Sequence, residues 1–486
     1  GWYTQYTPYQ PEISQGRLEA LLNYQTMITQ ITALPIANAS LLDEGTAASE
    51  AMLMLYRKNK SDKTQFLVDK ECFQQTIDVI ISRAEPLNID IIVTDFKNFD
   101  FTNAFGCIVQ YPNKYGQISS DNDYKCVISK AHNSNCKVIF ASDLMCLQLF
   151  DAPGNLGADI AVGNSQRFGV PLGYGGPHAA FMSTSEEFKR DIPGRIVGVS
   201  QDRRGNQAYR LTLQTREQHI RREKATSNIC TAQVLLAIIS GMYALFHGPD
   251  DLKNIARRIH SHTKELADKI AKLGHEIVTN DNSFFDTIVI KLSNMSIDSL
   301  KNKALQNNFN LMYHDNGLIG ISLDEKTDYS EVERLANIFD VHNDSENSYN
   351  IFKPNRTGDV LTHSIFHSIN SETEMLRYIN KLEKRDLSLN YSMIPLGSCT
   401  MKLNATVEMI PISWPEFNSI HPFAPLSQAN GYEKIINELE EMLYKVTGFD
   451  AVSFQPNSGA QGEYAGLLSI RAVSYTHLRA HETATY

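Results

Sequence analysis

The sequence predicts an α/β fold with a mostly parallel sheet, followed by a smaller α+β domain and the start of a second copy of the first fold. Three observations support this prediction: short β-branched runs alternate with helical stretches, the pattern changes after residue 245, and an N-terminal motif recurs more than four hundred residues later. With 486 residues, 42% of them hydrophobic, the chain is long enough for roughly three domains.

The first part of the chain reads as alternating strands and helices. Between the strands, residues 72–84 and 119–133 carry apolar side chains at helical spacing. This alternation is typical of a parallel sheet covered by helices on its faces. The predicted buried strands are residues 91–93, 107–109, 138–140, 160–162 and 179–181.

After residue 245 a helix over residues 251–272 leads into three further strand candidates, at residues 286–292, 310–313 and 318–323. A stretch rich in Asn, Ser and Pro follows at residues 343–356 and is typical of a linker. The predicted domains are therefore a large domain (1–245), a small α+β domain (246–342), a linker with a connecting helix (343–390), a truncated second copy (391–473) and a tail (474–486).

The evidence for a second copy is a match between residues 7–11 (TPYQP) and residues 421–425 (HPFAP). Gly16 and Gly431 then open similar helical stretches, and Met27 corresponds to Met442. The order of these matches indicates an internal duplication. Residues 474–486 break the pattern, since they lack apolar periodicity and resemble translated adapter sequence, so we expect a non-native tail.

Composition excludes several classes of function. The net charge of -10 and the pI of about 5.8 provide no positive field for nucleic acid or for an anionic membrane. No apolar run approaches the roughly 20 residues of a membrane helix. The seven cysteines are scattered, which argues against a disulfide framework and a zinc site, and we expect a reducing compartment and no metal.

One turn could hold an anion. Asn457, Ser458, Gly459 and Ala460 lie between a strand-like run, residues 452–454, and an apolar helix. Small residues at a helix start let backbone N–H groups approach a phosphate, although a tight turn needs small residues too, and the sequence leaves both readings open. The matching turn of the first copy contains Asp43 and Glu44, whose carboxylates would repel a phosphate.

Three other segments carry polar groups. The glycine-rich residues 169–177 are read as a structural turn, because they match neither common nucleotide-binding loop. The basic run from Arg203 to Lys224 could bind a carboxylate or an acidic protein, or it could be a solvated helix face. In the loop 397–404, Cys399 is more often a packing residue than a nucleophile.

Six strings in this chain are similar to one family, the glycine dehydrogenases (decarboxylating), or P-proteins, of the glycine cleavage system. Together these strings span the chain from its start almost to residue 473, so the resemblance covers residues 1–473. They are YTPYQPE (6–12), NASLLDEGTA (38–47), SQRFGVP (165–171), QTREQHIRREK (214–224), IPLGSCTMK (394–402) and QPNSGAQ (455–461).

The resemblance implies two aminotransferase-like halves of fold type I, of which the second binds pyridoxal phosphate on a lysine. It implies that glycine loses carbon dioxide and that its aminomethyl group passes to the lipoyl group of H-protein. It places the turn Asn457, Ser458, Gly459 and Ala460 at the cofactor phosphate, and Ser398, Thr400 and Lys402 near the substrate. It also implies a homodimer or an αβ-like assembly, in the cytoplasm of a bacterium or the mitochondrion of a eukaryote.

The cofactor lysine of the family is not found where the pattern would put it in this chain. Gln166 falls at the corresponding place in the first half, and an amide cannot form an imine. We therefore expect the lysine beyond residue 473, and a chain cut at both ends that is inactive on its own. The alternative is a non-catalytic subunit that binds a protein partner; another fold type I enzyme would need the lysine inside this chain.

Overall fold

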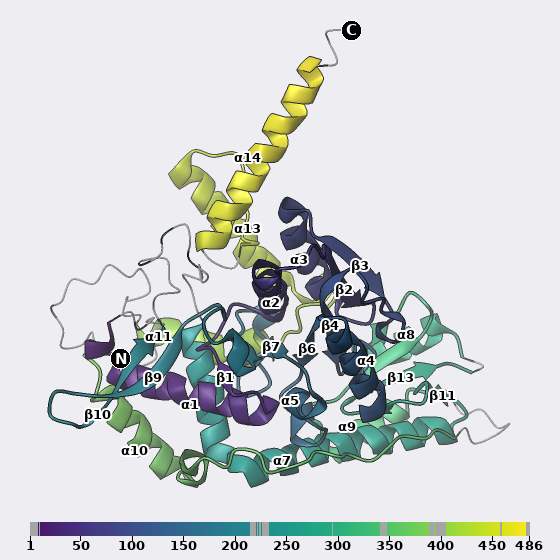
Figure 1. Cartoon of the computed structure of the whole chain (residues 1–486). Helices are drawn as coiled ribbons and strands as arrows, with labels where there is room; N and C mark the ends of the chain where they lie inside the picture. Colours follow the sequence, from purple (N-terminus) through teal and green to yellow (C-terminus); the bar gives the residue numbers. More distant parts are fainter. Residues whose placement is uncertain are drawn as a thin grey trace. The chain divides into compact units, whose positions relative to one another are not determined.

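The computed structural model describes residues 8, 10–213, 220, 222, 225, 233–293, 295–340, 348–387, 393, 405–456 and 459–482 (Figure 1). The chain divides into two compact units. Unit 1 comprises Gly1–Val170, His178–Asn228 and Gln233–Leu403, and unit 2 comprises Pro171–Pro177, Ile229–Ala232 and Asn404–Tyr486.

Unit 1 is built on a seven-stranded sheet in the order β1-β8-β7-β6-β4-β2-β3. Only β8 runs antiparallel to its neighbours, and all other pairs are parallel. Every residue of β4 is buried, as expected for a central strand covered on both faces. The strands are β1 (Ile36–Ala37), β2 (Gln65–Asp69), β3 (Asp90–Thr94), β4 (Ala104–Tyr111), β6 (Lys137–Ser142), β7 (Ile160–Asn164) and β8 (Ala180–Thr184).

Two of the helices that cover this sheet begin at side-chain caps. Asp43 accepts a hydrogen bond from Thr46 N (2.7 Å) to start α2, and Ser120 accepts one from Asp123 N (3.2 Å) to start α4. The predicted helices 72–84 and 119–133 are confirmed as α3 and α4, each beginning two residues later than expected. The helices are α1 (Gln15–Thr32), α2 (Glu44–Lys58), α3 (Gln74–Ala84), α4 (Asp121–Asn133) and α5 (Pro153–Leu156).

The long helix α7 (Val234–Lys272) is broken at Gly248, whose φ of 63° lies in the left-handed region, and Pro249 starts its second segment. The predicted helix 251–272 is this second segment. It packs against α9 and against a four-stranded antiparallel sheet, β11-β13-β15-β14. These elements are β11 (Glu276–Ile277), β13 (Thr287–Lys291), α8 (Ile297–Gln306), β14 (Met312–Tyr313), β15 (Ile319–Ser322) and α9 (Tyr329–Ala336).

We call the seven-stranded sheet with its helices the large lobe, and the four-stranded sheet with α8 and α9 the small lobe; both belong to unit 1. A short ladder joins the lobes, in which β5 (Gln117–Ile118) pairs with β12 (Ser283–Phe284). The Gln117 side chain adds a hydrogen bond from Nε2 to Val278 O (2.9 Å). The lobes are therefore in direct hydrogen-bonded contact.

The described part of the expected linker forms a strap, residues 348–387, across the large lobe. Arg356 is its anchor, because its guanidinium donates to the carbonyl oxygens of Ile31 (2.8 Å), Leu147 (3.0 Å) and Gln30 (3.2 Å). The strap ends with α10 (Glu372–Glu383), which packs on α1, and Leu387 N donates to Ile13 O (2.8 Å). The strap thus returns the chain to the place where α1 begins.

The structure corrects the helical interpretation of the basic run for residues 203–213, whereas Ile220, further along the run, is helical. The part that it describes, up to residue 213, is the hairpin of β9 (Ile196–Gln201) and β10 (Gln207–Thr212), with Arg203 and Arg204 in its exposed turn. Asp202 stabilises this turn, because its side chain accepts hydrogen bonds from Arg204 N (2.7 Å) and Asn206 N (2.9 Å). Residues 214–219, 221, 223 and 224 lie outside the described part.

Unit 2 contains α11 (Thr406–Met409), α12 (Pro415–Asn418), α13 (Asn430–Thr447) and α14 (Gly459–Glu482). The strand predicted at residues 452–454 is wrong, because these residues form no ladder. Unit 2 has no other strand among its described residues with which they could pair. The expected tail continues α14 as far as Glu482. Within the described ranges no helix combines the length and apolar character that crossing a membrane requires.

Candidate functional site

The polar side chains of the large lobe gather where its parallel strands end. Gln110 lies near the end of β4, Asp143 directly follows β6, and Ser165, Gln166 and Arg167 follow β7. Because β6 pairs with both β4 and β7 in parallel, these carboxyl ends meet at one edge of the sheet. Ligands of open α/β sheets bind at this edge, which makes it the candidate site.

Gln166 stands one residue after Ser165 at the end of β7, and its backbone N–H donates to Asn164 Oδ1 (3.1 Å). Ser165 Oγ is bonded to Ala179 O (2.9 Å) and to Ser240 Oγ (2.9 Å), which fixes this corner of the loop. At this corner the chain therefore offers an amide and a fully engaged hydroxyl, and no amine.

Arg167, the next residue, bridges the two lobes. Its guanidinium lies 3.3 Å from Asp143 Oδ2, is hydrogen-bonded to Asp286 of the small lobe, and stacks over Phe285 at 5.5 Å from the ring centroid. Although burial works against its charge, the two carboxylates raise the pKa of Arg167, so it stays protonated. Burial raises the pKa of Asp143, and Arg167 opposes this effect.

The turn into α2 faces the same edge and is acidic. Asp43 caps the helix, so one of the backbone N–H groups that a phosphate would need is already bonded. The half-buried Glu44 follows; burial raises its pKa to about 7, against hydrogen bonds from Gln110 and Thr76. Two carboxyl groups thus occupy the helix start where an anion would bind.

These residues do not fit pyridoxal phosphate. The cofactor needs a lysine for its aldehyde, a partner for its ring nitrogen and donors for its phosphate. At the place where the family resemblance puts the lysine, unit 1 has Gln166. The carboxylate of Asp143 is paired with Arg167, and the helix start that corresponds to the expected phosphate turn is capped by Asp43. The expectation that the first copy's turn repels a phosphate is consistent with this geometry.

The second-copy turn differs from the first. The expected apolar helix is α14, which begins at Gly459, earlier than the sequence suggested, and has no acidic residue in its first turn. Among the described residues, none lies within 4 Å of a Cβ added at Gly459. Ala460 lies in its first turn. Asn457 and Ser458 lie outside the described residues, as do Ser398, Cys399, Thr400 and Lys402.

The glycine-rich residues 171–177 belong to unit 2, whereas the sequence suggested only a structural turn. Tyr174 N donates to Ile420 O (2.9 Å), and the Tyr174 ring lies 4.6 Å from that of Tyr432 on α13, centroid to centroid. Gly175, with a φ of 85°, adjoins Pro422. This loop therefore contacts the HPFAP motif with which the second copy begins.

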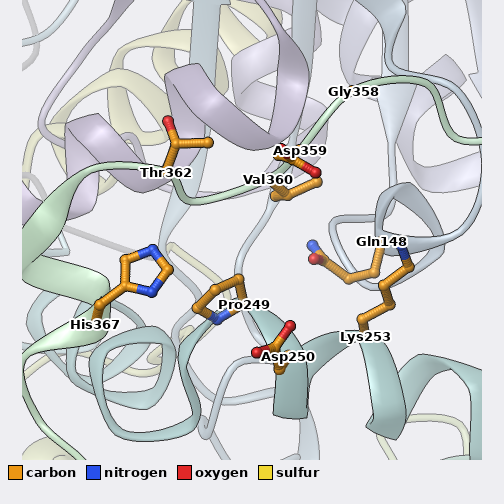
Figure 2. A pocket seen from close by; sticks show the side chains of 9 residues that line it. All are labelled: Gln148, Pro249, Asp250, Lys253, Gly358, Asp359, Val360, Thr362 and His367. Atoms are coloured by element: carbon orange, nitrogen blue, oxygen red, sulfur yellow. The ribbon is translucent and has the colours of Figure 1, made fainter.

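A separate cavity of about 260 Å³ lies at the kink of α7, against the strap (Figure 2). Its lining carries charges of both signs, so it lacks the convergent donors that a phosphate requires, and we do not count it as a cofactor site. The residues that line it are Gln148, Pro249, Asp250, Lys253, Gly358, Asp359, Val360, Thr362 and His367.

Sequence reasoning did not identify the Asp143–Arg167–Asp286 cluster. The signal available for Asp143 was its place directly after a predicted strand, where polar residues of α/β sheets often serve a ligand. No comparable signal marked Asp286, because its contact with Arg167 spans 119 positions of the chain.

Comparisons with known proteins identify the family. The model of the glycine cleavage system P-protein family matches residues 1–339. The glycine dehydrogenase (decarboxylating) of Nostoc punctiforme is 52% identical over 497 residues, covering 99% of this chain and 50% of that protein. The enzyme of the same name from Rhizobium leguminosarum bv. trifolii is 55% identical over 475 residues, covering 97% of this chain and 49% of that protein.

Among solved structures, glycine decarboxylase (P-protein) of the glycine cleavage system in inhibitor-bound form is similar, with a TM-score of 0.63 and 30% identity over 69% of this chain and 78% of that chain. This likeness confirms the predicted α/β fold class. The chain spans about half the length of the curated relatives it matches. It belongs to the P-protein family of the glycine cleavage system.

Proposed function

We propose that this chain carries the first half, and the start of the second half, of a glycine dehydrogenase (decarboxylating) that transfers the aminomethyl group of glycine to the lipoyl group of H-protein. The observation that carries the proposal is the 52–55% identity to such enzymes over nearly the whole chain. Pyridoxal phosphate would supply the electron sink for the loss of carbon dioxide.

In this proposal the first half has a structural role and the second half binds the cofactor. The first half is architectural, since Gln166, Arg167 and Asp43 leave its sheet edge unsuited to the cofactor. The turn of Asn457, Ser458, Gly459 and Ala460 holds the cofactor phosphate, and Ser398, Thr400 and Lys402 lie beside the substrate. The lysine that anchors the cofactor belongs to sequence beyond residue 473 in the full-length protein.

Complementation tests the proposal. The chain is produced alone and together with a polypeptide that supplies the rest of the second half, and each preparation is given glycine, lipoylated H-protein and labelled bicarbonate. We expect glycine–bicarbonate exchange only in the complemented preparation. Exchange by the chain alone, or a dialysis-stable chromophore that borohydride fixes on this chain, would contradict the assignment of the lysine.

The second candidate is a non-catalytic subunit that binds a protein partner within an αβ-like assembly. One observation favours it: the solved P-protein chain is covered to 78%, so a P-protein chain of comparable length exists. The internal duplication favours the first proposal, because a dedicated subunit has no need for a second copy's turn. Sequencing the locus past residue 473 separates them, since a continuous second half supports the enzyme and a stop codon supports the subunit.

A homodimer is the alternative assembly, and the compartment would be the cytoplasm in a bacterium or the mitochondrion in a eukaryote. Sedimentation of the protein expressed from its complete gene locus tests the assembly. A single species of twice the mass supports the homodimer, and two chains of unequal mass support the αβ-like form.

A further inference from the structure

The sheet edge of the first half contains a carboxylate of the kind that a pyridoxal phosphate site requires. This carboxylate, on Asp143, is already paired with an arginine of the same chain. In such sites a lysine holds the aldehyde while a carboxylate faces the ring nitrogen. Here Asp143 after β6 and Gln166 after β7 occupy adjacent strand ends. Asp143 faces the guanidinium of Arg167 instead of being open to a ligand.

We propose that Arg167 is a specificity-determining residue of this half: in addition to the missing lysine and the acidic turn, it excludes pyridoxal phosphate by occupying the carboxylate that the ring nitrogen would need. The inference rests on the proposed function only in assuming that pyridoxal phosphate is the family's cofactor.

Arg167 is well placed to do this because both lobes hold it. The carboxylate of Asp143 is held by hydrogen bonds at both oxygens: Oδ1 accepts from Cys146 N (2.7 Å), and Oδ2 accepts from Arg167. On the small lobe, Asp286 Oδ1 accepts from Thr287 Oγ1 (2.9 Å), and its Oδ2 receives the guanidinium. A ring nitrogen could pair with Asp143 only after displacing a charged group that two carboxylates and one aromatic face retain.

The test gives the first half the groups that it lacks and then removes Arg167. The background protein carries Asp43→Asn and Glu44→Ser, which reproduce the Asn-Ser turn of the second copy, and Gln166→Lys, which supplies an amine. The added lysine amine can condense with the cofactor aldehyde with loss of water, and hydride from borohydride then reduces the C=N bond to a stable amine. Peptide mass spectrometry reads the labelled fraction at residue 166, separately from surface lysines.

We expect Arg167→Ala, added to this background in the full chain, to raise the label at residue 166 about tenfold, the effect of freeing one charged hydrogen-bond acceptor. Arg167→Gln keeps most of the volume without the charge and should act in the same direction. Methylguanidinium added to the Arg167→Ala protein should suppress the label again. Arg257→Ala, an exposed arginine of α7, is the matched control and should change nothing.

Thermal unfolding shows which variants are folded, and only those are compared. Equal labelling with and without Arg167 would overturn the proposal, and so would a folded Arg167→Ala or Arg167→Gln protein that takes no label. This readout does not use glycine or H-protein. A failure of exchange activity in the complementation experiment would therefore count against the proposed function and leave the labelling result standing.

Discussion

At the scale of single residues, Asp69 is a carboxyl group at the end of β2 that is 2% exposed. Burial raises its pKa to about 7. The unfolded chain releases this proton near pH 3.9, so the contribution of Asp69 to stability is complete below about pH 4 and is lost as the pH rises through 7. The free energy of unfolding should therefore decrease with pH, by at most about 1.4 kcal/mol per pH unit for this one group, and we expect Asp69→Asn to make the decrease smaller. Urea unfolding of both proteins at pH 5 and pH 8 measures the decrease.

The exposed Asp100 provides the control. Hydrogen bonds from Thr102 lower the pKa of Asp100, so its contribution is present above its ordinary range and is lost only as the pH falls. Asp100→Asn should therefore keep the wild-type change between pH 5 and pH 8. If Asp69→Asn also kept all of that change, another group would be responsible for it.

Arg356 anchors the strap through three carbonyl oxygens, two of them, Gln30 and Ile31, at the end of α1, where helices leave carbonyl groups without partners. Replacing it by Ala removes these bonds from a buried place, and we expect a loss of about 2–4 kcal/mol in the free energy of unfolding. Arg356→Lys should give an intermediate loss, and the exposed Arg257→Ala a change within about 0.5 kcal/mol. Urea unfolding of the three variants measures these losses. An Arg356→Ala protein with an unchanged urea midpoint would show that Arg356 does not anchor the strap.

At the scale of elements, burial alone does not separate the strands that were predicted from those that were missed. The buried strand β2 was not predicted, whereas the predicted run 91–93 lies in β3, which has no buried residue. Residues 107–109 and 138–140 lie in β4 and β6, which are buried by helices, so hydrophobicity marks them. No strand was predicted at β9 and β10, because Gly198 and Arg210 give them the character of a solvated segment. A hairpin that packs one face on α1 shows too weak an alternation to be recognised.

The candidate site was predicted only in part. The absence of a lysine after β7 follows from one residue, Gln166, because β7 itself was predicted. The contact between Arg167 and Asp286 required the relative placement of two lobes, which no local pattern encodes. The apolar helix after the small-residue turn was predicted and is α14, although it begins at Gly459, inside the residues expected to form the turn. The preceding strand was predicted wrongly, because a strand depends on partners that the described part of unit 2 does not contain.

The two copies of the first helix give a matched pair. α1 and α13 each have 18 residues, and Met27 of α1 is fully buried while Met442 of α13 is 60% exposed. We expect Met27→Ala to cost about 2–5 kcal/mol, whereas Met442→Ala should change the free energy of unfolding by less than about 0.5 kcal/mol. Urea unfolding measures both, and a large loss for Met442→Ala would show that α13 is covered in this chain.

The apolar face of α13 has a further consequence for the isolated chain. None of its residues is buried, and its exposed apolar side chains are Ile435, Ile436, Leu439, Met442 and Val446. A face of this kind favours self-association. In the first half, the equivalent face of α1 is covered by α7, α10 and the β9–β10 hairpin.

At the scale of the whole molecule, the two units should unfold separately, because unit 1 has continuous cores and α13 of unit 2 has no buried residue. Trp414 lies in unit 2, and the only other tryptophan is Trp2. In a Trp2→Phe protein we expect the fluorescence of Trp414 to change at a lower temperature, and over a broader range, than the main circular dichroism transition. Coincident transitions would instead indicate one cooperative unit.

The hydrogen bond from Leu387 N to Ile13 O brings the two ends of the first half together. A module that closes on itself in this way can be repeated head to tail in a gene without stretching the connection, which is the geometry that a tandem duplication needs. It also tolerates relocation of its ends. Joining residue 387 directly to residue 13 and opening the exposed turn at Gly205 would give a circular permutant with every strand of the seven-stranded sheet still in place.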